Sequence, residues 1–250
     1  MNLRIISTFT FAFALTLCAG CSSNSEAPDK DLPADLPAVY QPGQTYGIDV
    51  DAADLTSHLT NPLFPVKAGA KWVYENKAGG VTERIDISVE PGEKEVWGTK
   101  ASIVRDTVTL DGEMIEDTWD WYAQDDNGHV WYLGEDTTEF KNGEPVCHCG
   151  AWEAGVNSAL PGVIMPNAPV VGHVYRQEYA PGEAEDYAEI IATKLQVSVP
   201  AGSFEGCVKT RDRSVLDATI DAFKYYCPGV GLVLEEEGGE RVELVEYSGL

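Results

Sequence analysis

Two thiols and an imidazole fall within three consecutive residues, Cys147, His148 and Cys149. Thiolate sulfur and imidazole nitrogen are ligands that Zn²⁺ and Cu⁺ bind in proteins. In a strand the two cysteines would face one side and His148 the other, so a site that uses all three needs a loop. Pro145 and Gly150 permit one. The sequence therefore contains a candidate metal site, whose alternative is a structural or disulfide role for the two cysteines.

A second kind of chemistry is indicated by Cys21, which ends an N-terminal segment with a basic residue, an apolar run over residues 5–17 and two small residues. The apolar run is too short to span a bilayer but has the length found in signal peptides. The segment resembles the lipobox of bacterial lipoproteins, in which the cysteine thiol takes a diacylglycerol. This resemblance implies a signal peptide at residues 1–20 and lipid attachment at Cys21, with palmitate-type acyl chains.

The lipid anchor implies a location in the cell envelope. Ser22 follows the modified cysteine and favours the outer membrane over the inner one if the host is Gram-negative. The formal net charge is −24, and such a chain is repelled by nucleic acid and by anionic lipid head groups. We therefore expect no nucleic-acid partner, and membrane attachment through the acyl chains on Cys21.

The two remaining cysteines of the expected domain are Cys207 and Cys227. Disulfides are the default in an exported protein, and four cysteines allow three pairings. We favour Cys207–Cys227, because a hairpin between strands over 205–213 and 219–227 would bring the two thiols close to facing positions. A bulge of one residue would complete the match. The other two cysteines then form a tight local disulfide or remain free thiols.

Composition divides the chain into a tether and one domain. Residues 21–58 are rich in Ser and Pro and poor in large apolar groups, so we expect a disordered tether there. From residue 59 to residue 250, short alternating or β-branched segments are separated by turn residues. Asp111-Gly112, directly after the β-branched segment over 102–110, is a typical hairpin turn.

This pattern predicts a single all-β domain over residues 59–250. The expected architecture is a single antiparallel, strongly curved sheet, half-barrel-like, or a β-sandwich. At most one short helix is expected, over residues 183–191, where a strand is the alternative. The predicted strands cover residues 71–75, 84–89, 102–110, 118–122, 130–133, 174–179, 189–199, 207–213, 222–226, 232–236 and 242–247.

Two motifs frame the domain. Residues 61–74 read NPxFPxxxGxxWxY, and residues 225–233 read YYxPGVGLV. Both resemble motifs of uncharacterised bacterial exported lipoproteins, and they are also similar to parts of LolA and TapB-like half-barrel domains. The resemblance implies one curved sheet around an apolar interior, and it implies no activity.

Signatures of catalysis are missing from the sequence. The chain contains no G-x-S-x-G, no H-E-x-x-H, no P-loop and no dinucleotide fingerprint. Acidic residues are so numerous that they identify no acid–base pair. The run Asp125-Asp126-Asn127-Gly128 resembles part of a Ca²⁺ loop, but its register fails, and a hairpin turn is favoured.

We therefore expect a non-enzymatic, lipid-anchored envelope protein without a cofactor. It would bind an apolar or envelope ligand or a protein partner. The alternative is a metal-ion-binding surface lipoprotein that holds Ca²⁺, Zn²⁺ or Cu⁺, either at Cys147, His148 and Cys149 or at its acidic residues.

Overall fold

Alternation of apolar and polar side chains gives this chain fourteen strands in the computed structural model, which describes Tyr40 and residues 46–250. The expected signal peptide over 1–20 and its lipid-bearing Cys21 lie outside the described residues. Within the described part, no helix is long and apolar enough to cross a bilayer. The strands are β1 Lys71–Ala78, β2 Val81–Val96, β3 Thr99–Leu110, β4 Glu113–Gln124, β5 Val130–Lys141, β6 Glu144–Cys147, β7 Trp152–Glu153, β8 Gly162–Met165, β9 Val174–Arg176, β10 Asp186–Val199, β11 Gly202–Ser214, β12 Ala222–Cys227, β13 Gly231–Glu237 and β14 Glu240–Ser248.

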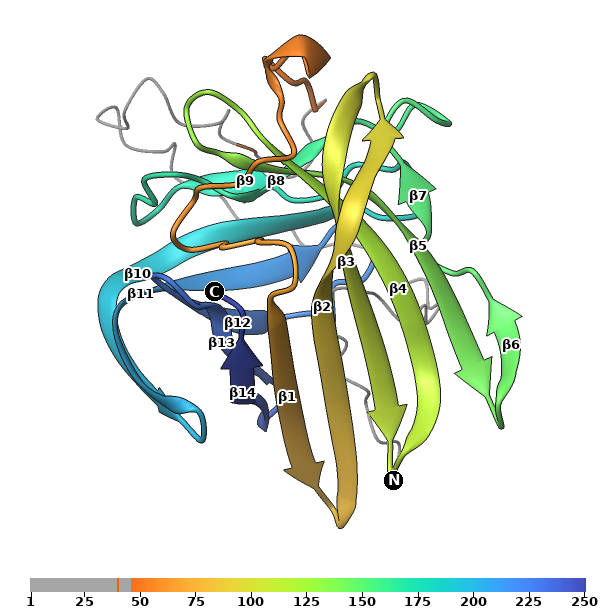
Figure 1. The fold of residues 1–250 in the computed structure, drawn as a ribbon, viewed down its shortest axis with the longest axis vertical. Coiled ribbons are helices and arrows are strands. Elements are labelled where there is room, and N and C mark those ends of the chain that lie inside the picture. Colours follow the sequence, from red (N-terminus) through yellow and green to blue (C-terminus); the bar gives the residue numbers. More distant parts are fainter. Residues whose placement is uncertain (1–39, 41–45) are drawn as a thin grey trace.

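All these strands belong to one antiparallel sheet, in the order β6-β5-β4-β3-β2-β1-β14-β13-β12-β11-β10-β9, with β7 and β8 paired to β5. The chain runs outward from β1 to β6 and later returns inward from β9 to β14, so β1 and β14 meet in the middle of the sheet. In Figure 1, β2–β4 run nearly vertically whereas β10 and β11 run across the picture. The sheet therefore curves strongly between its halves. The expected curved, all-β sheet is confirmed, and the sandwich alternative is not what forms.

The helix expected over residues 183–191 is wrong, and its strand alternative is correct. Asp186, Ala188 and Ile190 of β10 are buried, and the residues between them are partly exposed. That period of two is a strand pattern, and β10 pairs with both β9 and β11. Within the described residues, the only helix is a short 3₁₀ turn, Ala52–Asp54.

The expected boundary between tether and domain, after residue 58, is also wrong. Tyr40 is buried, and its backbone N–H donates to the Val174 carbonyl at 2.8 Å. Leu55 is buried in the core, and Thr56 exchanges two backbone hydrogen bonds with Gln124. Residues 46–58 therefore pack on the domain, because a few apolar side chains suffice to hold a segment whose backbone also pairs.

A disulfide joins β11 and β12 at the predicted position. Val208 faces Tyr226 across these strands, so Cys207 directly faces Cys227 and no bulge is needed. The two Cα atoms are 4.2 Å apart, and both side chains are fully buried. The predicted pairing is confirmed.

Candidate functional site

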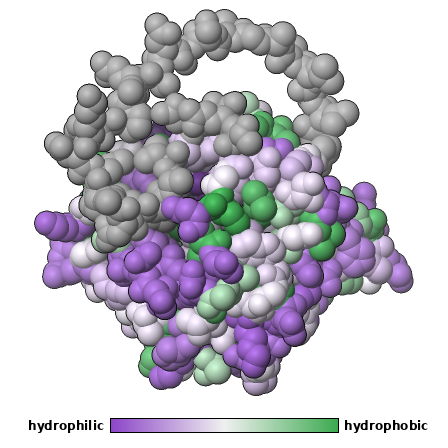
Figure 2. All heavy atoms as spheres, turned by 90° about the horizontal axis from the view of Figure 1, so that it is seen from above, coloured by the Kyte–Doolittle hydropathy of each residue, from purple (hydrophilic) through white to green (hydrophobic). Residues whose placement is uncertain are grey.

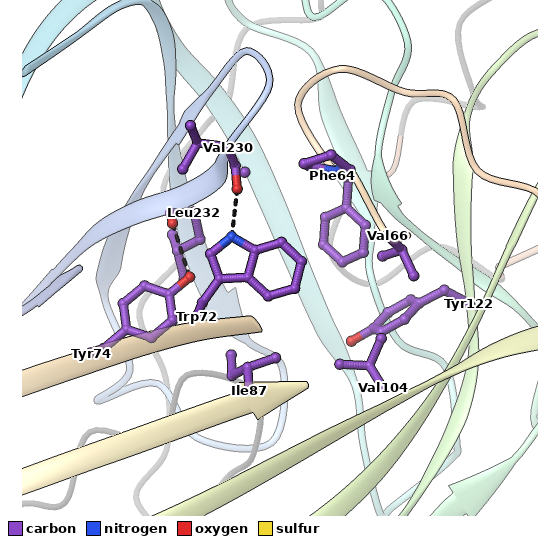
Figure 3. Close-up of a pocket in the computed structure, with 11 residues that line it drawn as sticks. Phe64, Val66, Trp72, Tyr74, Ile87, Val104, Tyr122, Val230 and Leu232 are labelled. Carbon is purple, nitrogen blue, oxygen red and sulfur yellow. Dashed lines mark hydrogen bonds between the residues drawn. The ribbon is translucent and has the colours of Figure 1, made fainter. Parts of the chain in front are cut away.

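The opening and closing motifs meet in space, although 158 positions separate their bonded residues. The Trp72 indole N–H donates to the Val230 carbonyl at 2.7 Å, and the Tyr74 hydroxyl donates to the Leu232 carbonyl at 2.9 Å. Figure 3 shows both bonds running from β1 to the chain at the start of β13. Two side chains of the opening motif therefore bind the backbone of the closing motif.

The glycines of the closing motif allow this approach. Gly229 donates its N–H to the Pro62 carbonyl at 2.7 Å. Gly231 has a φ of +89°, and a Cβ there would lie 3.2 Å from Cδ of Pro65. Only glycine adopts such a φ at no steric cost, so Gly231 suits both the turn and the close contact.

The Tyr74 hydrogen bond can be tested by removing one oxygen atom. We expect Tyr74→Phe to lower the free energy of unfolding by about 1–3 kcal/mol, because the buried Leu232 carbonyl loses its donor. Tyr175→Phe is the matched control: Tyr175 is 1% exposed, and its hydroxyl has no hydrogen-bond partner among the described residues. Urea unfolding of both variants checks the expectation, and equal losses would contradict it.

An apolar hollow of about 390 Å³, continuous with open solvent, lies where the two motifs meet. Its lining residues are Phe64, Pro65, Val66, Trp72, Tyr74, Ile87, Val104, Tyr122, Val230, Gly231 and Leu232. Figure 3 shows the rings of Phe64, Trp72 and Tyr122 entering it from three different segments. This volume includes open solvent, and the room inside the hollow itself is only about 40 Å³, so the hollow suits a small apolar group. Figure 2, the view from above, shows a mainly hydrophilic face with a small group of hydrophobic residues near its centre.

Behind the hollow lies a group of buried acids that the sequence did not reveal. We call these six residues the interior carboxylate cluster, and each is at most 8% exposed. They come from β4, β5, β10, β11, β13 and the segment between β9 and β10. The cluster consists of Asp120, Glu135, Glu178, Asp186, Asp212 and Glu235.

Tyr132 connects two members of this cluster. Its hydroxyl lies 2.5 Å from Oδ1 of Asp120 and 2.7 Å from Oε2 of Glu135. A hydroxyl has one proton to donate, and an ionised carboxylate only accepts. Both contacts are hydrogen bonds only if one of the two carboxyl groups is protonated and donates to the tyrosine oxygen. The geometry therefore implies a proton held between Asp120, Tyr132 and Glu135.

Electrostatics favour the same protonated state. Burial raises the pKa of Asp120 to about 7, although the Tyr132 hydrogen bond opposes the shift. Burial also raises the pKa of Asp186 and of Glu235 to about 8. The pKa of Lys224 is raised by Glu235 and Asp212, so its ammonium group stays charged and compensates part of the cluster.

The hollow and the cluster share a wall. Tyr122 lines the hollow, and its ring stacks on Tyr132 with centroids 4.8 Å apart. Burial, followed by the charges of Asp120 and Glu135, raises the pKa of Tyr122 well above its usual value. The Tyr122 hydroxyl therefore stays protonated, and it presents no anion to a bound ligand.

The structure does not bring the predicted metal ligands Cys147, His148 and Cys149 together. The two cysteines form a disulfide, with Cα atoms 5.3 Å apart. His148 is exposed, and its Nδ1 lies 3.0 Å from the Thr137 carbonyl oxygen. The carboxylate of Glu139, from β5, takes the third place beside the two sulfur atoms instead. Side-chain alternation at the end of β6 explains why His148 points elsewhere.

The hairpin turn predicted at residues 125–128 is confirmed. Asp125 accepts hydrogen bonds from the His129 backbone N–H and the Trp131 indole N–H, both at 2.9 Å. Its two carboxylate oxygens thus hold the turn together, and this use accounts for an acid that resembles a Ca²⁺ ligand in the sequence.

No family model, no curated protein and no solved structure matches this chain. The resemblance of residues 61–74 and 225–233 to exported lipoproteins and to LolA and TapB-like half-barrels stays a prediction.

Proposed function

We propose that this protein is a non-enzymatic, lipid-anchored component of the cell envelope that binds an apolar ligand in the hollow between its two motifs. The observation that carries the proposal is the hollow itself, whose walls are aromatic and aliphatic side chains. A hollow with such walls in an exported protein suits the end of an acyl chain or another small apolar group.

The chemistry of the walls favours binding over catalysis. The polar atoms of Trp72 and Tyr74 are committed to backbone carbonyls of the closing motif. No nucleophilic thiol or imidazole is present among the lining residues. The interior carboxylate cluster lies behind Tyr122 and is buried, so it does not offer a base at the ligand surface.

The expected affinity is modest. Burying roughly 200 Å² of apolar ligand surface contributes about 5 kcal/mol at 25 cal/mol per Å². Losses of rotational and translational freedom offset part of this gain. A dissociation constant of roughly a millimolar follows, which suits a ligand that is exchanged between sites.

The anchor is supported by the sequence alone. Cys21 follows a segment with the layout of a signal peptide, and both lie outside the described residues. In this proposal acyl chains on Cys21 hold the domain at a membrane, which is the outer one if the host is Gram-negative. Mass spectrometry of the mature chain tests the attachment, and an intact Met1 would contradict it.

Ligand binding is tested by filling the hollow. We expect brominated dodecanoic acid to quench tryptophan fluorescence of the full chain, because a bromine atom in the hollow contacts Trp72. Val104→Phe places a ring where the ligand would lie, so the dissociation constant should rise at least tenfold. The matched control is Val146→Phe, on a strand outside the hollow at a side chain that is 55% exposed.

Two outcomes would contradict ligand binding in the hollow. One is equal affinity for the wild-type chain and Val104→Phe. The other is unchanged quenching in Trp72→Phe, which removes the fluorophore of the hollow. Added core volume costs about 1–3 kcal/mol, so thermal melts should accompany each titration to show that the variants are folded.

A further inference from the structure

The hairpin of β5 and β6 places three soft or anionic ligand atoms at one point. Glu139 pairs with Cys147 across the two strands. The two sulfur atoms of Cys147 and Cys149 and a carboxylate oxygen of Glu139 all lie within 4.8 Å of one another. Among the described residues, the Glu139 carboxylate makes no hydrogen bond and no ion pair, although its side chain is partly buried. A carboxylate in that situation lacks a positive partner.

The two disulfides of the protein differ in access. Cys147 and Cys149 are partly exposed at the end of an edge hairpin, whereas Cys207 and Cys227 are fully buried. Thiol–disulfide exchange requires a reductant to reach a sulfur atom. A dithiol in solution therefore reaches the first pair and not the second while the domain stays folded.

We infer that Cys147, Cys149 and Glu139 form a Zn²⁺ site that is assembled when a dithiol reduces the Cys147–Cys149 bond. The dithiol gives two electrons and two protons to the disulfide, closes its own disulfide and leaves two thiols on the protein. Zn²⁺ then binds both sulfurs as thiolates, and their two protons pass to solvent. The disulfide that the dithiol became can reverse the step: it takes two electrons from the two thiolates and two protons from solvent, the Cys147–Cys149 bond closes, and the ion is released. This site goes beyond ligand binding in the hollow and does not depend on it.

The geometry suits zinc. Zn–S bonds of 2.3 Å and Zn–O bonds of about 2.0 Å place tetrahedral ligand atoms roughly 3.5–3.8 Å apart. The three atoms already lie within 4.8 Å, so small side-chain rotations bring them to that spacing. Gly150, with a φ of +86°, turns the chain directly after Cys149 and allows both sulfurs to face Glu139. The fourth position is left to solvent.

The ligand set also differs from the one that the sequence suggests. His148 lies on the other side of the hairpin, where its ring contacts Thr137 and Thr138. The inference therefore makes opposite predictions for two neighbouring side chains, Glu139 and His148. This difference distinguishes Zn²⁺ binding at one defined set of ligands from unspecific binding to an acidic surface.

The test is a zinc titration of the full chain, oxidised and after mild treatment with dithiothreitol, by calorimetry and native mass spectrometry. We expect one Zn²⁺ per reduced chain and none per oxidised chain. Glu139→Gln should raise the dissociation constant at least tenfold, and Cys147→Ser or Cys149→Ser should abolish binding. His148→Ala and the matched control Glu144→Gln, an exposed acid on β6, should stay within twofold of wild type.

Three results would overturn the inference. The first is equal zinc binding by oxidised and reduced chains. The second is an unchanged affinity in Glu139→Gln. The third is a loss in His148→Ala as large as that in the cysteine variants. Mapping of the disulfides after reduction confirms that Cys207–Cys227 is intact, so that a loss of fold is not mistaken for a loss of ligands.

Discussion

Gly162→Ala is expected to destabilise the domain by 3 kcal/mol or more, at or above the upper end of the usual cost of overpacking, which is about 1–3 kcal/mol. A Cβ at Gly162 would overlap the carbonyl group of Gln177 and lie 2.8 Å from the backbone nitrogen of Glu178. These atoms are backbone, so they cannot rotate away as a flexible side chain would. The strands on both sides must separate to make room.

The contact is important because it joins the two ends of the sheet. Gly162 begins β8, which pairs with β5, and Gln177 directly follows β9 at the other end. Nearby, the Leu160 backbone N–H donates to the Tyr179 carbonyl at 2.9 Å. A methyl group at position 162 therefore acts on the junction that keeps the curved sheet from opening.

Thermal and urea unfolding measure the loss. The matched control is Gly47→Ala, because a Cβ at Gly47 would meet no atom within 4 Å. Its expected change is within about 1 kcal/mol, with a slight gain from the less flexible unfolded chain. Equal stability of the wild-type chain and Gly162→Ala would show that the two ends of the sheet are not in contact.

Local signals allowed much of the fold to be predicted from the sequence. At the turn after β3, Asp111 and Gly112 have φ values of +50° and +86°, as a two-residue hairpin of this type requires. The pairing of Cys207 with Cys227 was predictable because one short hairpin sets the offset of the two strands. The identities of a few neighbouring residues are enough to decide such features.

Features that depend on the whole sheet could not be read in the same way. In β4 the buried residues Thr118 and Asp120 are polar, whereas Trp119 between them is partly exposed. Alternation along the strand predicts two faces, and hydrophobicity suggests that the face with Trp119 is the inner one. The structure instead buries the face with Thr118 and Asp120. The interior carboxylate cluster was missed for that reason, since its members come from five strands and one connection. The helix expected at residues 183–191 failed because pairing on both sides of β10 outweighed local propensity.

The domain is expected to lose stability as pH rises from about 4 to about 8, in contrast to proteins whose carboxylates are held by ion pairs. Burial raises the pKa of Asp186 from 3.8, and that of Glu235 from 4.5, to about 8. Between the unfolded and folded pKa values the folded state binds more protons, so each unit of pH disfavours folding. Below about pH 4 both states are protonated, and this contribution is fully present.

The size of the effect follows from the shifts. One pKa unit corresponds to about 1.4 kcal/mol, so the cluster should contribute a loss of several kcal/mol between pH 5 and pH 9. For a chain of this length that loss lowers the melting temperature by roughly 10 °C or more. Surface pairs act in the opposite direction at low pH, because the Arg211 hydrogen bond lowers the pKa of Asp221. Maximum stability is therefore expected on the acid side of neutrality.

Glu235→Gln tests whether the buried protons cause the slope. Glutamine keeps the shape but does not titrate, so the melting temperature should fall less steeply between pH 5 and pH 9 than in the wild-type chain. Above about pH 8, where the substitution removes a charge, Lys224 keeps Asp212 as a partner at 3.5 Å. Glu144→Gln, at an exposed site on β6, should leave the slope unchanged. A wild-type chain that melts higher at pH 9 than at pH 5 would mean that these carboxylates are ionised in the folded state.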